Sequence, residues 1–134
     1  MSGSMKCQVV KPSRKIYDGD ATFVVLPGSA GEMGVYVNHA PLVTTLGSGV
    51  VKIVAESGEE TRIAVFGGYA EIDGESVIVL ANRALPVSEI DAQLARSSAE
   101  KIKAEIAALP EDDPGIVYQQ EKLGWVNLLA HLSE

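Results

Sequence analysis

The sequence predicts a mainly β protein with a helical end: an antiparallel β-sandwich of about eight to ten short strands, followed by a C-terminal αα-hairpin. Two observations support this fold class. Up to about Asn82, short apolar runs rich in β-branched residues alternate with Gly, Pro, Asn and Asp, as in strands joined by turns. After Ala84, apolar residues recur at helical spacing. We therefore expect a β-domain over residues 5–84 and a helical domain over residues 85–134.

Each strand prediction rests on an apolar run that is too short for a helix and is bounded by turn residues. No helical stretch separates these runs, so the sheet should be mainly antiparallel. Asp73-Gly74 supplies the positive φ angles of a type I′ turn and predicts a tight hairpin. Pro86 should stop the last strand. The predicted strands include residues 23–26, 50–54, 61–66, 69–72 and 76–80.

The helical domain should start at a capping box, in which Ser88 is the N-cap and Asp91 follows three residues later. The segment from Pro110 to Gly115 must end this first helix, and a second amphipathic helix should cover residues 116–132. A loop this short predicts antiparallel packing of the two helices. Four alanines should let the partner helix approach: Ala95, Ala99, Ala104 and Ala107. One apolar face of the second helix should carry Val117, Leu123, Val126, Leu129 and Leu132.

Composition excludes several classes of function. Hydrophobic residues make up 46% of the chain and aromatic residues only 5%, so the core must be built from Val, Ile, Leu and Ala. The net charge of −7 disfavours nucleic acid and direct docking on anionic lipid, because both partners attract clustered Lys and Arg. Cys7 is the single cysteine and should be a small buried hydrophobe. No apolar run approaches the ~18 residues of a membrane-spanning helix, which favours a cytoplasmic protein that reaches membranes only through partners.

The chain offers no constellation of catalytic residues. His39 and His131 lie in different regions, without Cys or acidic residues at metal-ligand spacing. The Gly-rich segment from Gly28 to Gly34 lacks the Gly-Lys-[Ser/Thr] ending of a phosphate loop, so turns and a bulge are expected there. We therefore predict a protein that is not an enzyme and that holds no metal or cofactor.

Two adjacent motifs carry a resemblance to a known family. Gly31-Glu32-Met33-Gly34, followed by His39-Ala40-Pro41-Leu42, resembles the Gly-Glu-[Leu/Met/Ile]-Gly and His-x-Pro-Leu signature of the epsilon subunit of bacterial and chloroplast-type rotary F-type ATP synthases. Further segments resemble that family in the same order, from about Lys6 to about Ala95. They include residues 7–10, 16–19, 25–28, 49–53, 67–72 and 77–81.

The resemblance implies a coupling role. A subunit of this family lies in the rotor, where its sandwich binds the gamma subunit, rests on the polar loops of the c-ring, and helps to couple proton translocation to ATP synthesis. By this resemblance Glu32 and His39, with their neighbours Met33 and Leu42, contact partner proteins. Glu32 is expected on an exposed turn between glycines. The complex would lie peripherally at the cytoplasmic face of the cell membrane, and the hairpin would regulate ATP hydrolysis at the alpha/beta head.

The helical region departs from the family pattern. Many relatives carry Ile/Leu-Asp-x-x-Arg-Ala, an ATP-sensing motif, where this chain has Leu94 at the arginine position. An aliphatic side chain cannot pair with a phosphate, so Asp91 and Arg96 are the remaining candidates for an ATP site. In relatives that inhibit ATP hydrolysis, basic residues of the last helix meet an acidic segment of the beta subunit. Here Lys122 is the one lysine after residue 115, so inhibition of ATP hydrolysis would rest on apolar packing instead. The residues for such packing are Trp125, Leu128 and Leu129.

Two other readings of the sequence are a stand-alone β-sandwich that binds a nucleotide or another small ligand, and a small hydrolase or isomerase on a similar barrel. The missing catalytic constellation disfavours the second. Binding to a cognate gamma subunit distinguishes the coupling subunit from both.

Overall fold

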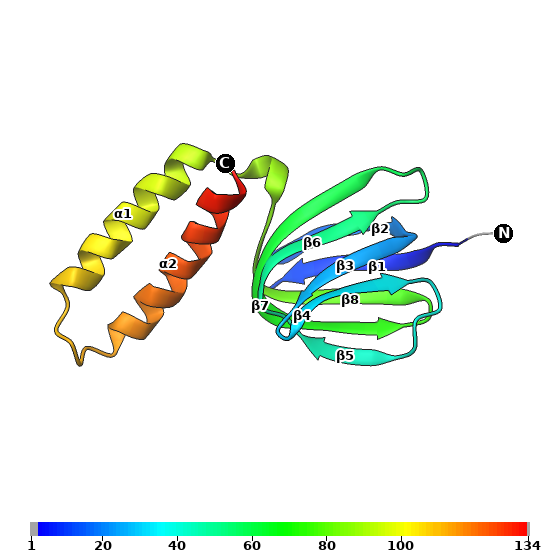
Figure 1. Cartoon of the computed structure of the whole chain (residues 1–134), viewed down its shortest axis with the longest axis horizontal. Coiled ribbons are helices and arrows are strands. Elements are labelled where there is room, and N and C mark those ends of the chain that lie inside the picture. The colour runs from blue at the N-terminus through cyan, green and yellow to red at the C-terminus, as the bar shows by residue number, and fades with distance from the viewer. Residues whose placement is uncertain (1–2, 134) are drawn as a thin grey trace. The chain divides into compact units, whose positions relative to one another are not determined.

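The computed structural model describes residues 3–133, and it divides into two compact units (Figure 1). The first unit ends at Ser88 and is a β-sandwich; the second begins at Glu89 and is a helical hairpin. The predicted fold class is confirmed, with eight strands in the sandwich. The boundary predicted at residue 84 falls inside the last strand, which continues to Pro86.

The elements follow one another without long loops. The strands are β1 (Met5–Lys11), β2 (Arg14–Ala21), β3 (Phe23–Gly28), β4 (Gly31–Tyr36), β5 (Leu42–Thr45), β6 (Ser48–Val54), β7 (Glu60–Asp73) and β8 (Ser76–Pro86). A short 3₁₀ turn (Val87–Glu89) precedes the helices α1 (Ala92–Ala108) and α2 (Gly115–Leu132).

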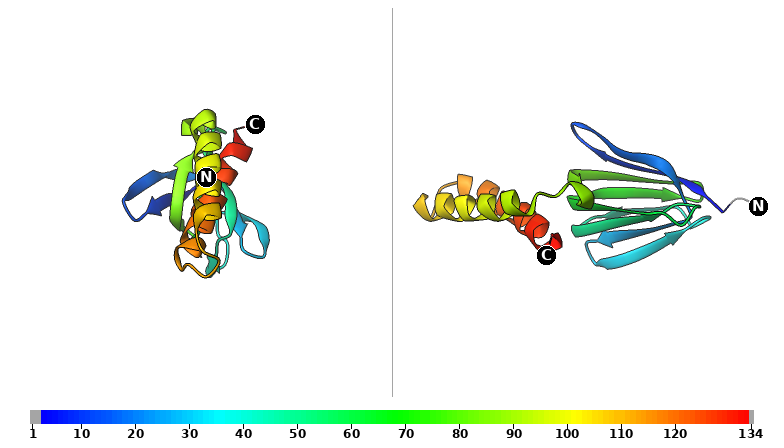
Figure 2. Two further views of the ribbon diagram at one scale, coloured as in Figure 1. Left: turned by 90° about the vertical axis from the view of Figure 1, so that its left-hand side faces the viewer. Right: turned by 90° about the horizontal axis from the view of Figure 1, so that it is seen from above.

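The strands pair in the order β2-β1-β8-β7-β6-β3-β4, and β5 pairs with β7. Every pair is antiparallel except β1 with β8, which is parallel. In the view from above, β1 and β2 lie on one side of the sandwich and β3 and β4 on the other, with β7 and β8 between them (Figure 2). The two long strands therefore belong to both layers.

The bend in β7 lies at Gly67 and Gly68. Before the bend β7 pairs with β6, up to Phe66 opposite Ser48; after it β7 pairs with β5, from Tyr69 opposite Thr45. The φ angles of the two glycines are 73° and 116°, which L side chains rarely adopt. The sequence prediction of two strands here was wrong. The glycines bend one 14-residue strand instead of ending it.

The core lies between the two layers and is built from small and β-branched side chains. The inward residues of β1, β7 and β8 pack against those of β3, β4 and β6. Cys7 is fully buried among them, as predicted, and burial raises the pKa of its thiol to about 12. The thiol is therefore protonated and unreactive at neutral pH. Core residues with no exposed surface include Val9, Val24, Leu26, Val35, Val51, Val77 and Val79.

The turn between β7 and β8 is tight, as predicted, but it is not of type I′. Its central residues are Gly74 and Glu75, and neither has a positive φ. The carboxylate of Asp73 holds the turn instead, because its Oδ1 accepts hydrogen bonds from the backbone N–H groups of Glu75 (2.9 Å) and Ser76 (3.0 Å). These bonds favour the charged carboxylate, and the one from Glu75 is the main reason that the pKa of Asp73 is lowered.

The first helix begins later than predicted. Its N-cap is Asp91, whose Oδ1 accepts a hydrogen bond from the N–H of Leu94 at 3.0 Å, whereas Ser88 lies in the 3₁₀ turn. The predicted capping box was therefore wrong. Asp has the short acceptor side chain that an N-cap requires, and it stands three residues nearer to the helix.

The helices form the predicted hairpin, but with a different contact face. Ala95, Ala99 and Ile102 of α1 are buried at spacings of four and three residues, whereas Ala104 and Ala107 are exposed. The predicted role of those two alanines was wrong, since they lie on another side of the helix. Beyond Ile102, the Nε2 of Gln119 donates a hydrogen bond to Glu105 at 2.7 Å across the hairpin. In α2, Leu129 is buried as predicted, whereas Val117 is 69% exposed and does not belong to the packed face.

Gly68→Ala should destabilise the sandwich by about 3 kcal/mol, because the new Cβ has both a positive φ and an overlap with the Leu80 carbonyl oxygen. The matched control is Gly58→Ala, where φ is 92° but no atom lies within 4 Å, so the loss should be only about 1 kcal/mol. Urea unfolding followed by far-UV circular dichroism measures both. Equal losses of unfolding free energy in the two variants would show that the overlap with the Leu80 carbonyl oxygen contributes nothing.

Asp91→Ala should destabilise the hairpin by about 1 kcal/mol, because the first turn of α1 loses its N-cap acceptor. Ser88→Ala is the control and should change the free energy of unfolding by less than about 0.5 kcal/mol. The fluorescence of Trp125, the single tryptophan, reports unfolding of the hairpin. A larger loss of stability for Ser88→Ala than for Asp91→Ala would instead support Ser88 as the N-cap.

Candidate functional site

The signature segment forms a strand where the sequence indicated a turn. Gly31–Tyr36 is β4, which pairs with β3 around a two-residue turn, Ser29-Ala30. Glu32 lies opposite Pro27, close to this turn, with its side chain exposed and without an ion pair among residues 3–133. The expectation of a turn was wrong. Glycines often interrupt a strand, but Gly31 and Gly34 both pair with residues of β3. The carboxylate of Glu32 is nevertheless free to meet a partner.

Gly34 makes room for an aromatic stack on the outside of this hairpin. A Cβ on Gly34 would come within 2.9 Å of the ring of Phe23. That ring stacks on Tyr36 with centroids 4.4 Å apart and planes inclined by 26°, and Tyr36 is 65% exposed. The stack packs the exposed ring of Tyr36, at the end of β4, against Phe23 of β3.

His39 lies in the loop that follows β4. Its N–H donates to the carbonyl of Tyr36 at 3.2 Å, and its Nδ1 lies 2.6 Å from the carbonyl oxygen of Ala40, to which it donates. Asn38, with a φ of 70°, turns the chain and donates its N–H to the carbonyl of Gly74. The imidazole is thereby oriented by the backbone, with Nε2 left as the ring nitrogen for a partner.

The four predicted contact residues form two pairs instead of one cluster. Glu32 and Met33 lie near the β3–β4 turn, whereas His39 lies beyond the other end of β4, and Leu42 lies opposite Ile72, next to the β7–β8 turn. The strand from Glu32 to Tyr36 alone separates the pairs by about 13 Å. Met33 is half-buried against the core, and Leu42 is 41% exposed. The two pairs can therefore contact different partner surfaces.

An apolar outer face, which sequence reasoning missed, covers the layer of β1, β8, β7 and β5. Val43 and Tyr69 are 66% and 43% exposed, and both side chains point away from the core because Ala70 and Ile72 point into it. Val10 and Leu80 line a hollow of about 270 Å³ beside Tyr69. The available signal in the sequence was the alternation along β7 of Tyr69 and Glu71, which are exposed, with Ala70 and Ile72, which are buried.

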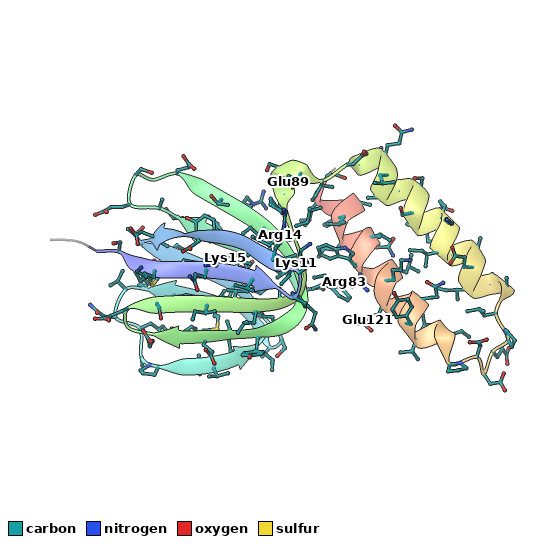
Figure 3. All side chains as sticks on the ribbon, turned by 180° about the vertical axis from the view of Figure 1, so that it is seen from behind. Lys11, Arg14, Lys15, Arg83, Glu89 and Glu121 are labelled. Atoms are coloured by element: carbon teal, nitrogen blue, oxygen red, sulfur yellow. The ribbon has the colours of Figure 1, made fainter. Side chains whose placement is uncertain are left out.

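Cations border this outer face at the β1–β2 turn, where Lys11, Arg14 and Lys15 lie close together (Figure 3). Lys15 pairs with Asp18 at 3.2 Å. The hydrogen bond from Lys15 is the main reason that the pKa of the Asp18 carboxyl is lowered. An apolar centre with a charged rim is the usual composition of a protein-binding surface.

The candidates for an ATP site are not brought together. Asp91, Gln93, Leu94 and Ser97 line a shallow hollow on the first turns of α1. Asp91 already caps the helix, Leu94 is 61% exposed, and Arg96 is exposed outside this lining. The hollow therefore presents a carboxylate and an aliphatic side chain, a poor match for a triphosphate.

Over residues 3–133, no three His, Cys, Asp or Glu side chains are close enough to share a metal ion. Within the same part of the chain, no helix is long and apolar enough to cross a membrane.

Comparisons with known proteins place these features in a family. The family model for the β-sandwich domain of the ATP synthase delta/epsilon chain matches residues 4–87. The ATP synthase epsilon chain of Prochlorococcus marinus is 39% identical over 110 residues, which cover 82% of this chain and 81% of that one. The sodium-ion-specific epsilon chain of Propionigenium modestum is 39% identical over 117 residues, or 87% of this chain and 85% of that one. Epsilon chain 2 of Burkholderia orbicola is 45% identical over 92 residues, or 68% of this chain and 60% of the length of that relative.

Solved structures show the same fold. A chain of the Euglena gracilis mitochondrial ATP synthase, in a structure of its OSCP, F1 and c-ring, superposes with a TM-score of 0.81 at 19% identity, covering 100% of this chain and 84% of that one. A chain of the central stalk and c-ring structure of the Tetrahymena thermophila mitochondrial ATP synthase gives a TM-score of 0.63 at 12% identity, covering 97% and 96%. At these identities the likeness is one of fold.

Proposed function

The chain belongs to the ATP synthase delta/epsilon chain family, and from this membership we propose that it is a non-catalytic subunit of the central stalk that helps to couple proton translocation through the membrane sector to ATP synthesis. The observation that carries the proposal is the extent of the likeness to epsilon chains. The match to the Propionigenium modestum chain spans 117 residues, more than the 88 residues of the sandwich unit, and so includes part of the hairpin.

The apolar outer face is the proposed docking surface for the gamma subunit. Val43 and Tyr69 are exposed at its centre, beside the hollow that Val10 and Leu80 line, while the cations at the β1–β2 turn give the surface a charged edge. Burial of such a centre against a protein partner removes apolar area from water at about 25 cal/mol per Å². His39, in the loop before β5, lies at the end of this surface nearest the β7–β8 turn, whereas Leu42 is opposite Ile72 and shares the inward side of the sheet.

Glu32 and Met33 are the proposed contact with the polar loops of the c-ring. Glu32 is exposed and free of an ion pair among the described residues, and beside it a Cβ on Gly31 would have no atom within 4 Å. Met33 anchors the strand on the core beneath it. A polar loop can therefore approach the carboxylate closely without displacing the sandwich.

The hairpin is the proposed regulatory part, acting on the alpha/beta head by apolar contacts. Of the residues expected to make these contacts, Leu129 is buried within the hairpin, and Trp125 and Leu128 are half-buried. The exposed apolar residues of α2 are instead Val117 (69%) and Tyr118 (61%), and the last turn offers His131 as its basic residue. We place the assembled protein at the cytoplasmic face of the cell membrane, attached through the complex. The stand-alone ligand-binding module has no comparable support, since the relatives with the longest matches are epsilon chains.

Val43→Glu should weaken binding to the cognate gamma subunit at least about tenfold, because the charge must be desolvated in the centre of the interface. Val117→Glu is the matched control, since it places the same charge at a valine of similar exposure on the hairpin. Co-purification and isothermal titration calorimetry with gamma measure the effect. A properly folded wild-type chain that does not bind gamma would refute the proposed function.

Glu32→Gln should leave folding and gamma binding unchanged but loosen coupling, because the c-ring loops lose a charged partner. The measurement is ATP-driven proton pumping relative to ATP hydrolysis in enzyme reconstituted into vesicles. Glu56→Gln, in the exposed β6–β7 turn, is the control for loss of one negative charge. Equal pumping-to-hydrolysis ratios in the wild type and Glu32→Gln would rule out the contact.

A further inference from the structure

An exposed carboxylate, that of Glu71 on β7, lies in the middle of the apolar outer face. Glu71 is directly opposite Val43 of β5 on one side and Ile78 of β8 on the other. Residues that are paired across a sheet point to the same side, and so do residues two apart on one strand, which adds Tyr69 to this face. The exposed carboxylate is therefore bordered by apolar side chains on three sides.

The sandwich supplies no cation to this carboxylate. Within residues 3–133, Glu71 makes no ion pair. Strand register places two lysines on the same face, Lys6 of β1 and Lys15 of β2. Because β8 lies between β7 and β1, both lysines start at least about 10 Å from Glu71, and Lys15 is already paired with Asp18 at 3.2 Å.

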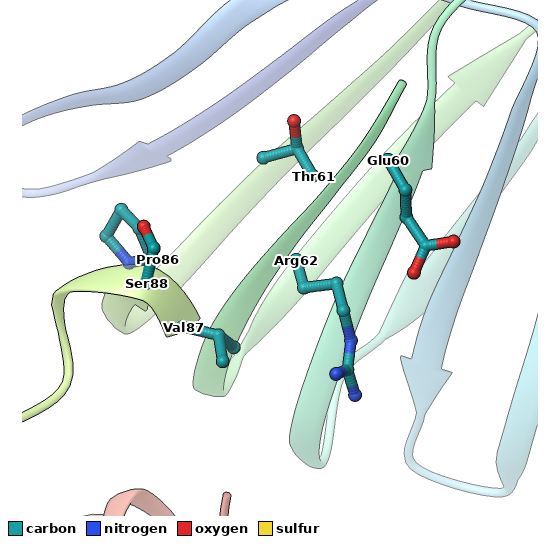
Figure 4. Close-up of a pocket in the computed structure, with 6 residues that line it drawn as sticks. All are labelled: Glu60, Thr61, Arg62, Pro86, Val87 and Ser88. Atoms are coloured by element: carbon teal, nitrogen blue, oxygen red, sulfur yellow. The ribbon is translucent and has the colours of Figure 1, made fainter. Parts of the chain in front are cut away.

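A second exposed glutamate of the same strand shows the contrast. Glu60 lies at the start of β7, beside a hollow of about 370 Å³ in the sandwich unit (Figure 4). Its carboxylate pairs with the Nζ of Lys52 at 3.5 Å. Arg62 is two residues further along on the same side of β7, and its guanidinium lies across the strand from Pro86, so the hollow does not gather polar groups around it. Glu60 thus has a cation of the sandwich itself, whereas Glu71 has none among the described residues.

The hollow beside Tyr69 explains how a partner could shield the carboxylate from water. Val10, Leu80 and Tyr69 lie directly opposite one another on β1, β8 and β7, in the row of side chains next to Glu71. They line the hollow of about 270 Å³, which leaves room for an apolar side chain of a partner. A side chain seated there would exclude water beside Glu71, and an ion pair is stronger where water is excluded.

We propose that Glu71 determines the specificity of the apolar outer face by accepting a basic side chain, arginine or lysine, from the gamma subunit. The inference rests on the gamma docking proposed above and adds the chemistry that gamma must present at this point. A carboxylate that is buried without a counter-ion is costly to desolvate, so a protein surface without a cation at this position is rejected. The apolar surround contributes affinity, and the charge contributes selectivity.

Glu71→Gln in the full-length chain should weaken binding to the cognate gamma subunit about thirtyfold, because the basic side chain of gamma is then buried without its counter-ion. Glu60→Gln is the matched control, since it makes the same change on the same strand but on the outer face of the other layer, and it should leave the affinity within about twofold. Isothermal titration calorimetry measures both affinities.

Urea unfolding of the free chain separates this role from a structural one. The unfolding midpoint of Glu71→Gln should equal that of the wild type, because Glu71 makes no ion pair within residues 3–133. Weakened gamma binding accompanied by a lower midpoint would assign Glu71 to the stability of the sandwich and overturn the inference.

The cation on gamma is found by replacing each Lys and Arg of gamma with Ala in turn and measuring the affinity for the wild type and for Glu71→Gln. One replacement should weaken binding to the wild type without weakening binding to Glu71→Gln further, as expected of a direct pair. Equal affinities of the wild type and Glu71→Gln, or additive effects of every gamma replacement, would overturn the inference and leave gamma docking in place. A wild-type chain that does not bind gamma would overturn both.

Discussion

The sandwich depends on the bend that Gly67 and Gly68 impose on β7. A straight strand of this length would belong to one sheet, but two consecutive positive φ angles turn it from the layer that contains β6 into the layer that contains β5. The backbone of β8 passes so close to Gly68 that a Cβ would overlap the Leu80 carbonyl oxygen. Because both layers share β7 and β8, one continuous run of backbone hydrogen bonds from β2 to β4 joins the layers on either side of the core.

The same arrangement distributes the exposed surfaces. Residues that alternate with the core of the β1–β8–β7–β5 layer form the apolar face around Tyr69, and those of the other layer form the Phe23–Tyr36 stack and the Lys52–Arg62 pair. Two layers with their inner faces packed together must turn their outer faces in opposite directions. A stalk subunit with such a sandwich can therefore meet different partners on different faces.

The two helices of the hairpin pack against each other over a small contact. The buried residues of α1 are two alanines, Ala95 and Ala99, which bury little area, and Ile102. The buried Oε1 of Gln119 has no hydrogen-bond partner within residues 3–133. A helix pair with so small a contact is poorly stabilised by itself. The weakly packed element is the one to which we assign regulation, in keeping with the low local stability of moving parts.

The sequence by itself determined the fold class, the hairpin end and the family, because strand and helix periods and a motif with fixed spacing are local properties of the chain. Several features were decided only by the tertiary structure: the glycines at 67 and 68 bend one strand instead of separating two, Glu32 lies in a strand, and Asp91 caps α1 instead of Ser88. The separation of Glu32 from His39, the face around Tyr69 and the position of Glu71 in the middle of that face also belong to this group. Glycine tolerates strand and turn alike, and which side chains share a face depends on the register between strands far apart in the chain, which no local pattern records.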